Sequence, residues 1–113
     1  MFGFGKKDAS QDITAGDLAH RLRTGDGLLL VDVREPWEFS QGHIAGSKLI
    51  PLDQLSTQLA RLPRDKTLVA VCRTGNRSSV ATSLLKRAGY DALNLKGGVV
   101  DWARSGLPLS GQR

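Results

Sequence analysis

The stretch "VAVCRTGNRSSVATSLL", residues 69–85, places the only cysteine of the chain between an apolar run and a segment with helical spacing. The residues before Cys72 are apolar without alternation, which is typical of a strand buried on both faces. After the loop, apolar residues recur at the spacing of one helix face, and we expect these to point inward: Val80, Ala81, Leu84, Leu85 and Ala88. The stretch therefore predicts a strand, a tight loop and a helix, with Cys72 at the carboxyl end of the strand.

The rest of the chain alternates in the same way. Four segments read as strands: "LLLVDVR" (28–34), "SKLIPL" (47–52), "DKTLVAVC" (65–72) and "DALNLKGG" (91–98), with a possible fifth short strand around Ile13. Helical patterns lie between them, the first capped by Thr14 and ended by Gly25. Strands that alternate with helices indicate a parallel sheet covered on both faces. We therefore expect an α/β fold with a central parallel sheet of four to five strands.

The length of 113 residues allows one compact domain, and no repeat or linker divides it. We expect residues 1–12 to form a flexible leader, residues 13–108 the domain and residues 109–113 a tail. The leader lacks the apolar region of a secretory signal, and a lone cysteine fits a reducing compartment, so a cytoplasmic location is predicted. No apolar run approaches the ~20 residues of a membrane helix, so no membrane association is expected.

The net charge of +5 raises the question of a nucleic-acid partner. The basic residues are spread along the chain, aromatic residues make up only 5%, and no nucleic-acid motif is present, so we expect none. A positive field does attract small anions.

Polar groups follow two of the predicted strands at their carboxyl ends, the edge where α/β sheets bind ligands. Asp32 and Arg34 follow one strand, and Cys72 follows another. The loop after Cys72 runs into a helix N-terminus, where free backbone N–H groups and the helix dipole favour an anion. Gly75 permits a tight turn that would direct such groups at the sulfur.

A helix N-terminus and nearby arginines lower the pKa of a thiol, and the thiolate is the reactive form. With Arg73 and Arg77 in its loop, Cys72 is the candidate nucleophile. His20 and His43 do not lie at metal-ligand spacing from the cysteine, so no metal is expected, and His43 is expected to bond backbone. Trp37 and Phe39 are predicted to be packing residues.

The segment "VCRTGNRSS" (71–79) resembles the active-site loop of the rhodanese family of sulfurtransferases. "LLLVDVREPWEFSQGHIAGSKLIPL" (28–52) and "NLKGGVVDWARSGLP" (94–108) are similar to the same family in the same order, so the resemblance runs from Ile13 to Pro108. It implies a single rhodanese-like domain. In the related dual-specificity phosphatases and arsenate reductases, the loop arginine lies six positions after the cysteine. Here Arg77 lies five positions after Cys72, which disfavours a phosphatase.

The resemblance implies that Cys72 takes a sulfane sulfur from thiosulfate or a persulfide donor, becomes a persulfide, and passes the sulfur to a thiol or cyanide. No cofactor or metal is implied. The loop residues would bind the small anionic donor: Arg73, Thr74, Gly75, Asn76, Arg77 and Ser78. Asp32, Arg34 and Glu38 are expected to hold the loop in shape, with Arg34 or Glu38 contacting its arginines. Gly97 and Gly98 are predicted to let the backbone approach the loop closely.

Two alternatives remain at this point. The protein could be a persulfide carrier that receives sulfur from a protein partner and turns over little thiosulfate, or a non-catalytic binding module of the same fold. The cysteine and the basic loop count against the binding module. The loop arginines favour a small anionic donor but would equally bind an acidic protein edge. Nothing in the sequence demands more than a monomer.

Overall fold

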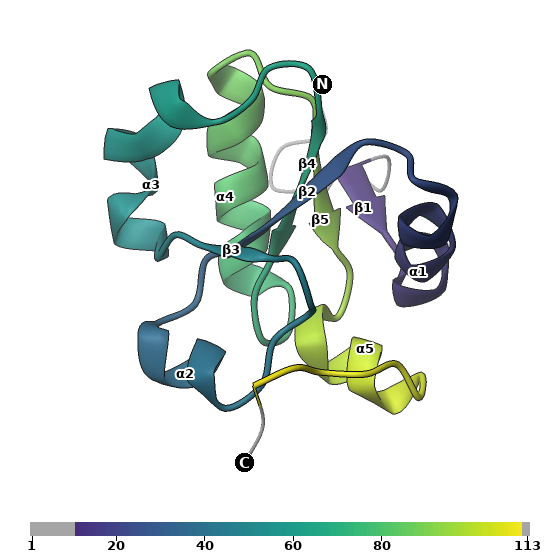
Figure 1. Cartoon of the computed structure of the whole chain (residues 1–113). Helices are drawn as coiled ribbons and strands as arrows, with labels where there is room; N and C mark the ends of the chain where they lie inside the picture. The colour runs from purple at the N-terminus through teal and green to yellow at the C-terminus, as the bar shows by residue number, and fades with distance from the viewer. Residues whose placement is uncertain (1–10, 112–113) are drawn as a thin grey trace, which may run out of the picture.

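The computed structural model describes residues 11–111, and its centre is one sheet of five parallel strands (Figure 1). The strands lie in the order β1-β5-β4-β2-β3. Their bounds are β1 Asp12–Ile13, β2 Leu28–Asp32, β3 Lys48–Leu49, β4 Thr67–Val71 and β5 Ala92–Leu95. The predicted parallel α/β sheet is confirmed, including the short strand at Ile13.

Helices cover both faces of the sheet, with α3 and α4 on one face and α1 and α5 on the other (Figure 1). The helices are α1 Ala15–Thr24, α2 Pro36–Ser40, α3 Leu52–Gln58, the 3₁₀ turn η2 Leu59–Arg61, α4 Asn76–Arg87 and α5 Gly98–Arg104. The Thr14 hydroxyl accepts a hydrogen bond from the Asp17 N–H at 3.1 Å, and Gly25 ends α1 in a left-handed conformation, as predicted. Local capping and the apolar pattern therefore agree on where α1 begins and ends.

The sheet core is centred on β4, in which residues 68–71 are fully buried. On the side of α4, however, the buried stripe consists of Ser78, Ala81, Thr82 and Leu85, while the side chain of Val80 is 58% exposed. The prediction that Val80 points inward was wrong. Two polar residues take inward positions on this helix because their hydroxyls find partners there: that of Ser78 contacts the Cys72 sulfur, and that of Thr82 donates to the Ser78 carbonyl.

The carboxyl ends of β2 and β4 lie side by side, since Asp32 pairs with Val71 and the N–H of Val33 donates to the Val71 carbonyl at 2.9 Å. Cys72 and the residues after Asp32 therefore reach the same edge of the sheet. Within residues 11–111, no helix has the length and apolar character needed to cross a membrane. The predicted flexibility of the leader falls almost entirely on residues outside the described range, and the proposed limits of the domain and tail stay predictions.

Candidate active site

The Cys72 sulfur is surrounded by the loop that follows it. The backbone N–H of Gly75 donates to Sγ at 3.1 Å, and the backbone N–H of Ser78 donates at 3.3 Å. Gly75 has φ 105°, a left-handed conformation that curls the chain back over the sulfur just before α4 begins. Cys72 is only 1% exposed, so these N–H groups replace water around Sγ.

Two opposing effects set the acidity of this thiol. Burial raises the pKa of Cys72, because the buried anion loses its hydration. The backbone N–H groups of Ser78, Gly75 and Thr74 form hydrogen bonds to the sulfur and lower it, and the net result is a pKa below the ordinary value of a cysteine. The loop is therefore built to hold a sulfur anion in a site that is almost closed to water.

The loop rests on the first turn of α5. The N–H of Val99 donates to the Cys72 carbonyl at 2.9 Å, and the N–H of Val100 donates to the Arg73 carbonyl at 3.1 Å. Such close contact requires Gly98, because a Cβ atom there would lie 2.4 Å from both carbonyl oxygens. The close approach predicted for the glycine pair is thus confirmed at Gly98, and Trp102 is buried on the same helix.

A bidentate ion pair joins the loop to α2. Arg77 donates to the two oxygens of Glu38 at 2.7 and 2.8 Å. The hydrogen bonds from Arg77 lower the pKa of Glu38 to about 2, even though partial burial acts in the opposite direction. The structure thus brings Glu38, and not Arg34, to an arginine of the loop.

Asp32 and Arg34 pair with each other instead of with loop groups. Arg34 Nη2 lies 2.7 Å from Asp32 Oδ2 and 2.9 Å from the Gly42 carbonyl, and both side chains are buried. The pair connects the end of β2 to the segment after α2. It therefore supports the α2 side of the site without contacting the loop itself.

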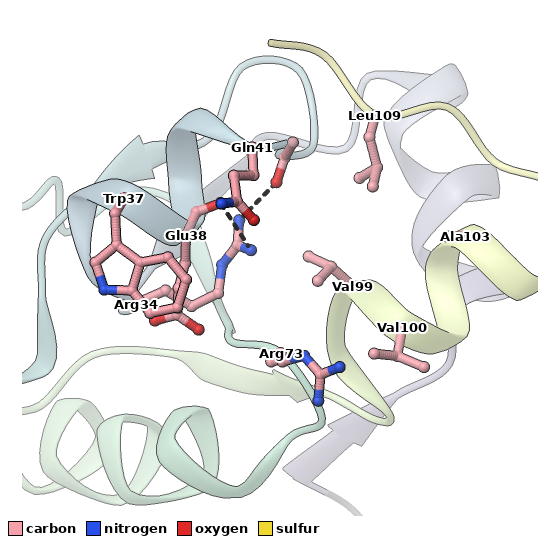
Figure 2. A pocket seen from close by; sticks show the side chains of 10 residues that line it. Arg34, Trp37, Glu38, Gln41, Arg73, Val99, Val100, Ala103 and Leu109 are labelled. Carbon is pink, nitrogen blue, oxygen red and sulfur yellow. Dashed lines mark hydrogen bonds between the residues drawn. The ribbon is translucent and has the colours of Figure 1, made fainter. Parts of the chain in front are cut away.

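A cleft of about 260 Å³ opens beside the loop, between α2 and α5 (Figure 2). Trp37 lines one wall, Val99 and Val100 line the other, and Arg73 lies at the loop end. Trp37 is 64% exposed, so the prediction that it is a packing residue was wrong; the short helix α2 carries it at the edge of the cleft, where most of its surface faces solvent. Arg73 is exposed and lines the cleft, whereas Arg77 is engaged by Glu38.

The remaining predicted residues of the loop lie at its turn and at the start of α4. Thr74 and Asn76 are exposed, and Ser78 is fully buried with its hydroxyl oxygen 3.2 Å from Cys72 Sγ. His43 contacts the backbone, with Nδ1 at 2.8 Å from the Phe39 carbonyl oxygen, as expected. Its ring stacks on that of Phe39.

One residue of the site was missed from the sequence. Asn94 is 1% exposed, and its side-chain oxygen accepts a hydrogen bond from the Ser78 hydroxyl at 2.6 Å. The available signal was a polar residue inside the apolar strand "ALNL", because buried amides in a sheet need hydrogen-bond partners.

Comparison with known proteins identifies the family. The rhodanese-like domain matches residues 14–105. The chain belongs to this family. A sulfurtransferase of Allochromatium vinosum is 38% identical over 99 residues, covering 87% of this chain and 92% of that protein. The thiosulfate sulfurtransferase GlpE of Pseudomonas aeruginosa is 36% identical over 89 residues, covering 78% of this chain and 80% of that protein.

A solved structure supports the same assignment. The rhodanese-related protein of Thermoplasma volcanium superposes with a TM-score of 0.84 at 34% identity, covering 89% of this chain and 98% of the other. Together, the rhodanese family and the relatives named sulfurtransferase support a sulfurtransferase activity in general terms.

The contact between α5 and the loop generates a first prediction. Gly98→Ala should lower the free energy of unfolding by at least about 2 kcal/mol, because the added Cβ meets two carbonyl oxygens at a residue with φ +58°. Gly16→Ala is the matched control, since no atom lies within 4 Å of its added Cβ in α1. The control should stabilise by up to about 1 kcal/mol. Urea unfolding measures both, and equal effects would contradict the close contact.

The Glu38–Arg77 pair generates a prediction on pH. The folded pKa of Glu38, about 2, lies below its unfolded value, so the pair stabilises the protein above pH ~4.5 and this contribution is lost as the pH falls toward 2. The free-energy gap between the wild type and Glu38→Gln should therefore shrink over that window. Urea unfolding at a series of pH values tests this, and a gap that does not change with pH would argue against an ionised pair.

Proposed function

We propose that this protein is a sulfurtransferase that moves a sulfane sulfur from thiosulfate or a persulfide donor to a thiol or cyanide acceptor through a persulfide on Cys72. One observation carries the proposal: Cys72 Sγ is buried at the carboxyl end of β4 and accepts backbone N–H bonds from Gly75 and Ser78. Donors of this kind stabilise charge on Sγ and on a sulfur atom attached to it.

The reaction runs in two displacements. The Cys72 thiolate attacks the outer sulfur of thiosulfate, the sulfur–sulfur bond of the donor breaks, and sulfite leaves with that bond's electron pair. Cys72 then carries a persulfide anion. An acceptor thiolate or cyanide attacks the outer sulfur of this persulfide, and the Cys72 thiolate leaves unchanged. No proton is consumed in either step, so a lowered Cys72 pKa serves both the attack and the departure.

The size of the site supports sulfur over phosphate. A residue with an exposed fraction of 1% can be reached only by a narrow group, and the sulfane sulfur is a single atom at the end of its donor. The spacing of five from Cys72 to Arg77 agrees with this, because it closes a smaller loop than the spacing of six in the related phosphatases.

The charge around the cleft supports an anionic donor. Arg73 takes part in none of the ion pairs within residues 11–111, whereas Arg77 is neutralised by Glu38. Arg73 is therefore the arginine that we assign to thiosulfate. The name of the Pseudomonas aeruginosa relative, a thiosulfate sulfurtransferase, is consistent with this donor.

The acceptor and the cell location are proposed on narrower grounds. A thiol acceptor follows from the reaction class, and the cleft between α2 and α5 leaves room for the molecule that bears this thiol. A cytoplasmic location and a monomeric state stay predictions. The binding-module alternative is not favoured, because it leaves the lowered pKa of Cys72 without a use.

The persulfide is tested by the intact mass of the protein after incubation with thiosulfate, without reductant. We expect the wild type to gain the mass of one sulfur atom, to lose it on addition of cyanide, and to release thiocyanate. Cys72→Ser should gain nothing and should remain folded, because the substitution exchanges one atom at the end of a strand.

Two results would contradict this function. A gain of equal mass by Cys72→Ser would place the sulfur elsewhere on the chain. A wild type that gains no sulfur from thiosulfate or from a small-molecule persulfide, but gains it from a persulfidated protein, would make the protein a carrier.

The role of Arg73 is tested by steady-state kinetics. Arg73→Gln should raise KM for thiosulfate about three- to tenfold, the loss expected for one charged contact to an anion, with kcat changed less. Arg23→Gln is the matched control, because it removes the same charge from the exposed last turn of α1. Equal KM values for both variants would show that only the overall positive field attracts the donor.

A further inference from the structure

A chain of hydrogen-bonded side chains leads away from the Cys72 sulfur, from the start of α4 to the strands β5 and β1. Ser78 Oγ lies 3.2 Å from Sγ and 2.6 Å from Asn94 Oδ1. Asn94 Nδ2 in turn donates to Asp12 Oδ1 at 3.1 Å. Asn94 and Asp12 are register partners on the neighbouring strands β5 and β1, so the sheet itself holds them together.

The direction of each hydrogen bond in this chain can be assigned by counting protons. A carboxylate only accepts, so Asp12 must face the Asn94 amide nitrogen, and this orients the amide group. The Asn94 oxygen then faces Ser78, and an amide oxygen can only accept. The Ser78 hydroxyl has one proton, and that proton is therefore donated to Asn94.

We propose that Asn94, anchored by Asp12, is a positioning residue that directs the only proton of the Ser78 hydroxyl away from the Cys72 sulfur. The Ser78 oxygen then presents a lone pair to Sγ. It can accept from the thiol S–H, but it cannot donate to the thiolate without breaking the short bond to Asn94. In the resting arrangement, the sulfur anion is held by backbone N–H groups, of which those of Gly75 and Ser78 lie within 3.3 Å.

This arrangement affects reactivity. A thiolate that accepts one more hydrogen bond is more populated, but it is also a weaker nucleophile, because nucleophilicity falls as the pKa falls. By withholding the Ser78 proton, Asn94 keeps the Cys72 sulfur reactive while the backbone donors keep it ionised. The inference rests on the proposed function only in treating Cys72 as the nucleophile, and it applies to any acceptor.

Charged groups on the elements around the sulfur also act on its titration, and the experiment must hold them constant. They lie on the loop, on α2, α4 and α5, on the turn before α5 and at the strand ends: Asp12, Asp32, Arg34, Glu38, Arg73, Arg77, Lys96 and Asp101. A cycle built from Asn94→Leu and Ser78→Ala changes none of these groups. Their contributions therefore cancel when the two substitutions are compared.

The test follows the thiolate absorbance of the full chain near 240 nm against pH, with Cys72→Ser as the blank. Asn94→Leu frees the Ser78 proton for the sulfur, so the midpoint should fall by roughly one pH unit, the size of one hydrogen bond to an anion. The rate of reaction with iodoacetamide at the high-pH plateau should fall about threefold. In the Ser78→Ala background, Asn94→Leu should change neither quantity.

The test includes two control variants and one replacement variant. Thr82→Val removes a buried hydroxyl one turn along α4, which donates to the Ser78 carbonyl, and should not move the midpoint. Ser79→Ala makes the same change as Ser78→Ala at the next residue. If Asn94→Leu does not fold, Asp12→Ala takes its place. This substitution removes the anchor of the Asn94 amide, which can then rotate and stop accepting the Ser78 proton, and Asp12 itself is only partly buried.

Asp12→Ala also removes a negative charge, and the Ser78→Ala background separates the two effects. The part of the midpoint shift that is lost in the Ser78→Ala background comes from the Ser78 proton. The part that remains comes from the lost charge of Asp12. A midpoint that is unchanged in Asn94→Leu, or that moves equally with and without the Ser78 hydroxyl, would overturn the proposal. Neither result bears on whether Cys72 forms a persulfide, which the mass experiment decides separately.

Discussion

A buried sulfur can hold negative charge only where hydrogen-bond donors replace the water that it has lost. In this protein the replacement comes from the backbone of one short loop, in which Gly75 and Ser78 direct their N–H groups at Cys72 Sγ. The position of a backbone donor depends only on the conformation of the loop. The loop must therefore be held in one conformation by contacts with the rest of the protein. Most other features of the site serve this requirement.

The loop is fixed from three directions. The strand β4 positions its first residue, the N–H groups of Val99 and Val100 bind its carbonyl oxygens, and Glu38 holds Arg77 at its far end. The carbonyl contacts satisfy the backbone and hold the peptide groups after Cys72 and Arg73 in a fixed orientation. A fold with parallel strands suits this task, since the carboxyl ends of β2 and β4 meet at one edge of the sheet.

The parallel sheet, the helices on both of its faces and the position of Cys72 at a strand end could be predicted from local signals, because apolar runs and caps act over a few residues. The residues that depend on packing between distant segments could not. Val80 was placed inward although hydrogen-bonding residues occupy that face of α4, and Trp37 was taken for a packing residue although it is exposed. Asn94 drew no attention because its partners, Ser78 and Asp12, lie 16 and 82 residues away along the chain.

The most direct test of the central claim is a crystal structure of the protein after a thiosulfate soak. The account predicts a second sulfur atom bonded to Cys72 Sγ, lying inside the loop within hydrogen-bond distance of its backbone N–H groups, with the Glu38–Arg77 pair in place. Thiosulfate bound in the cleft beside an unmodified Cys72, or a sulfur atom that lies outside the loop and contacts only side chains, would contradict it.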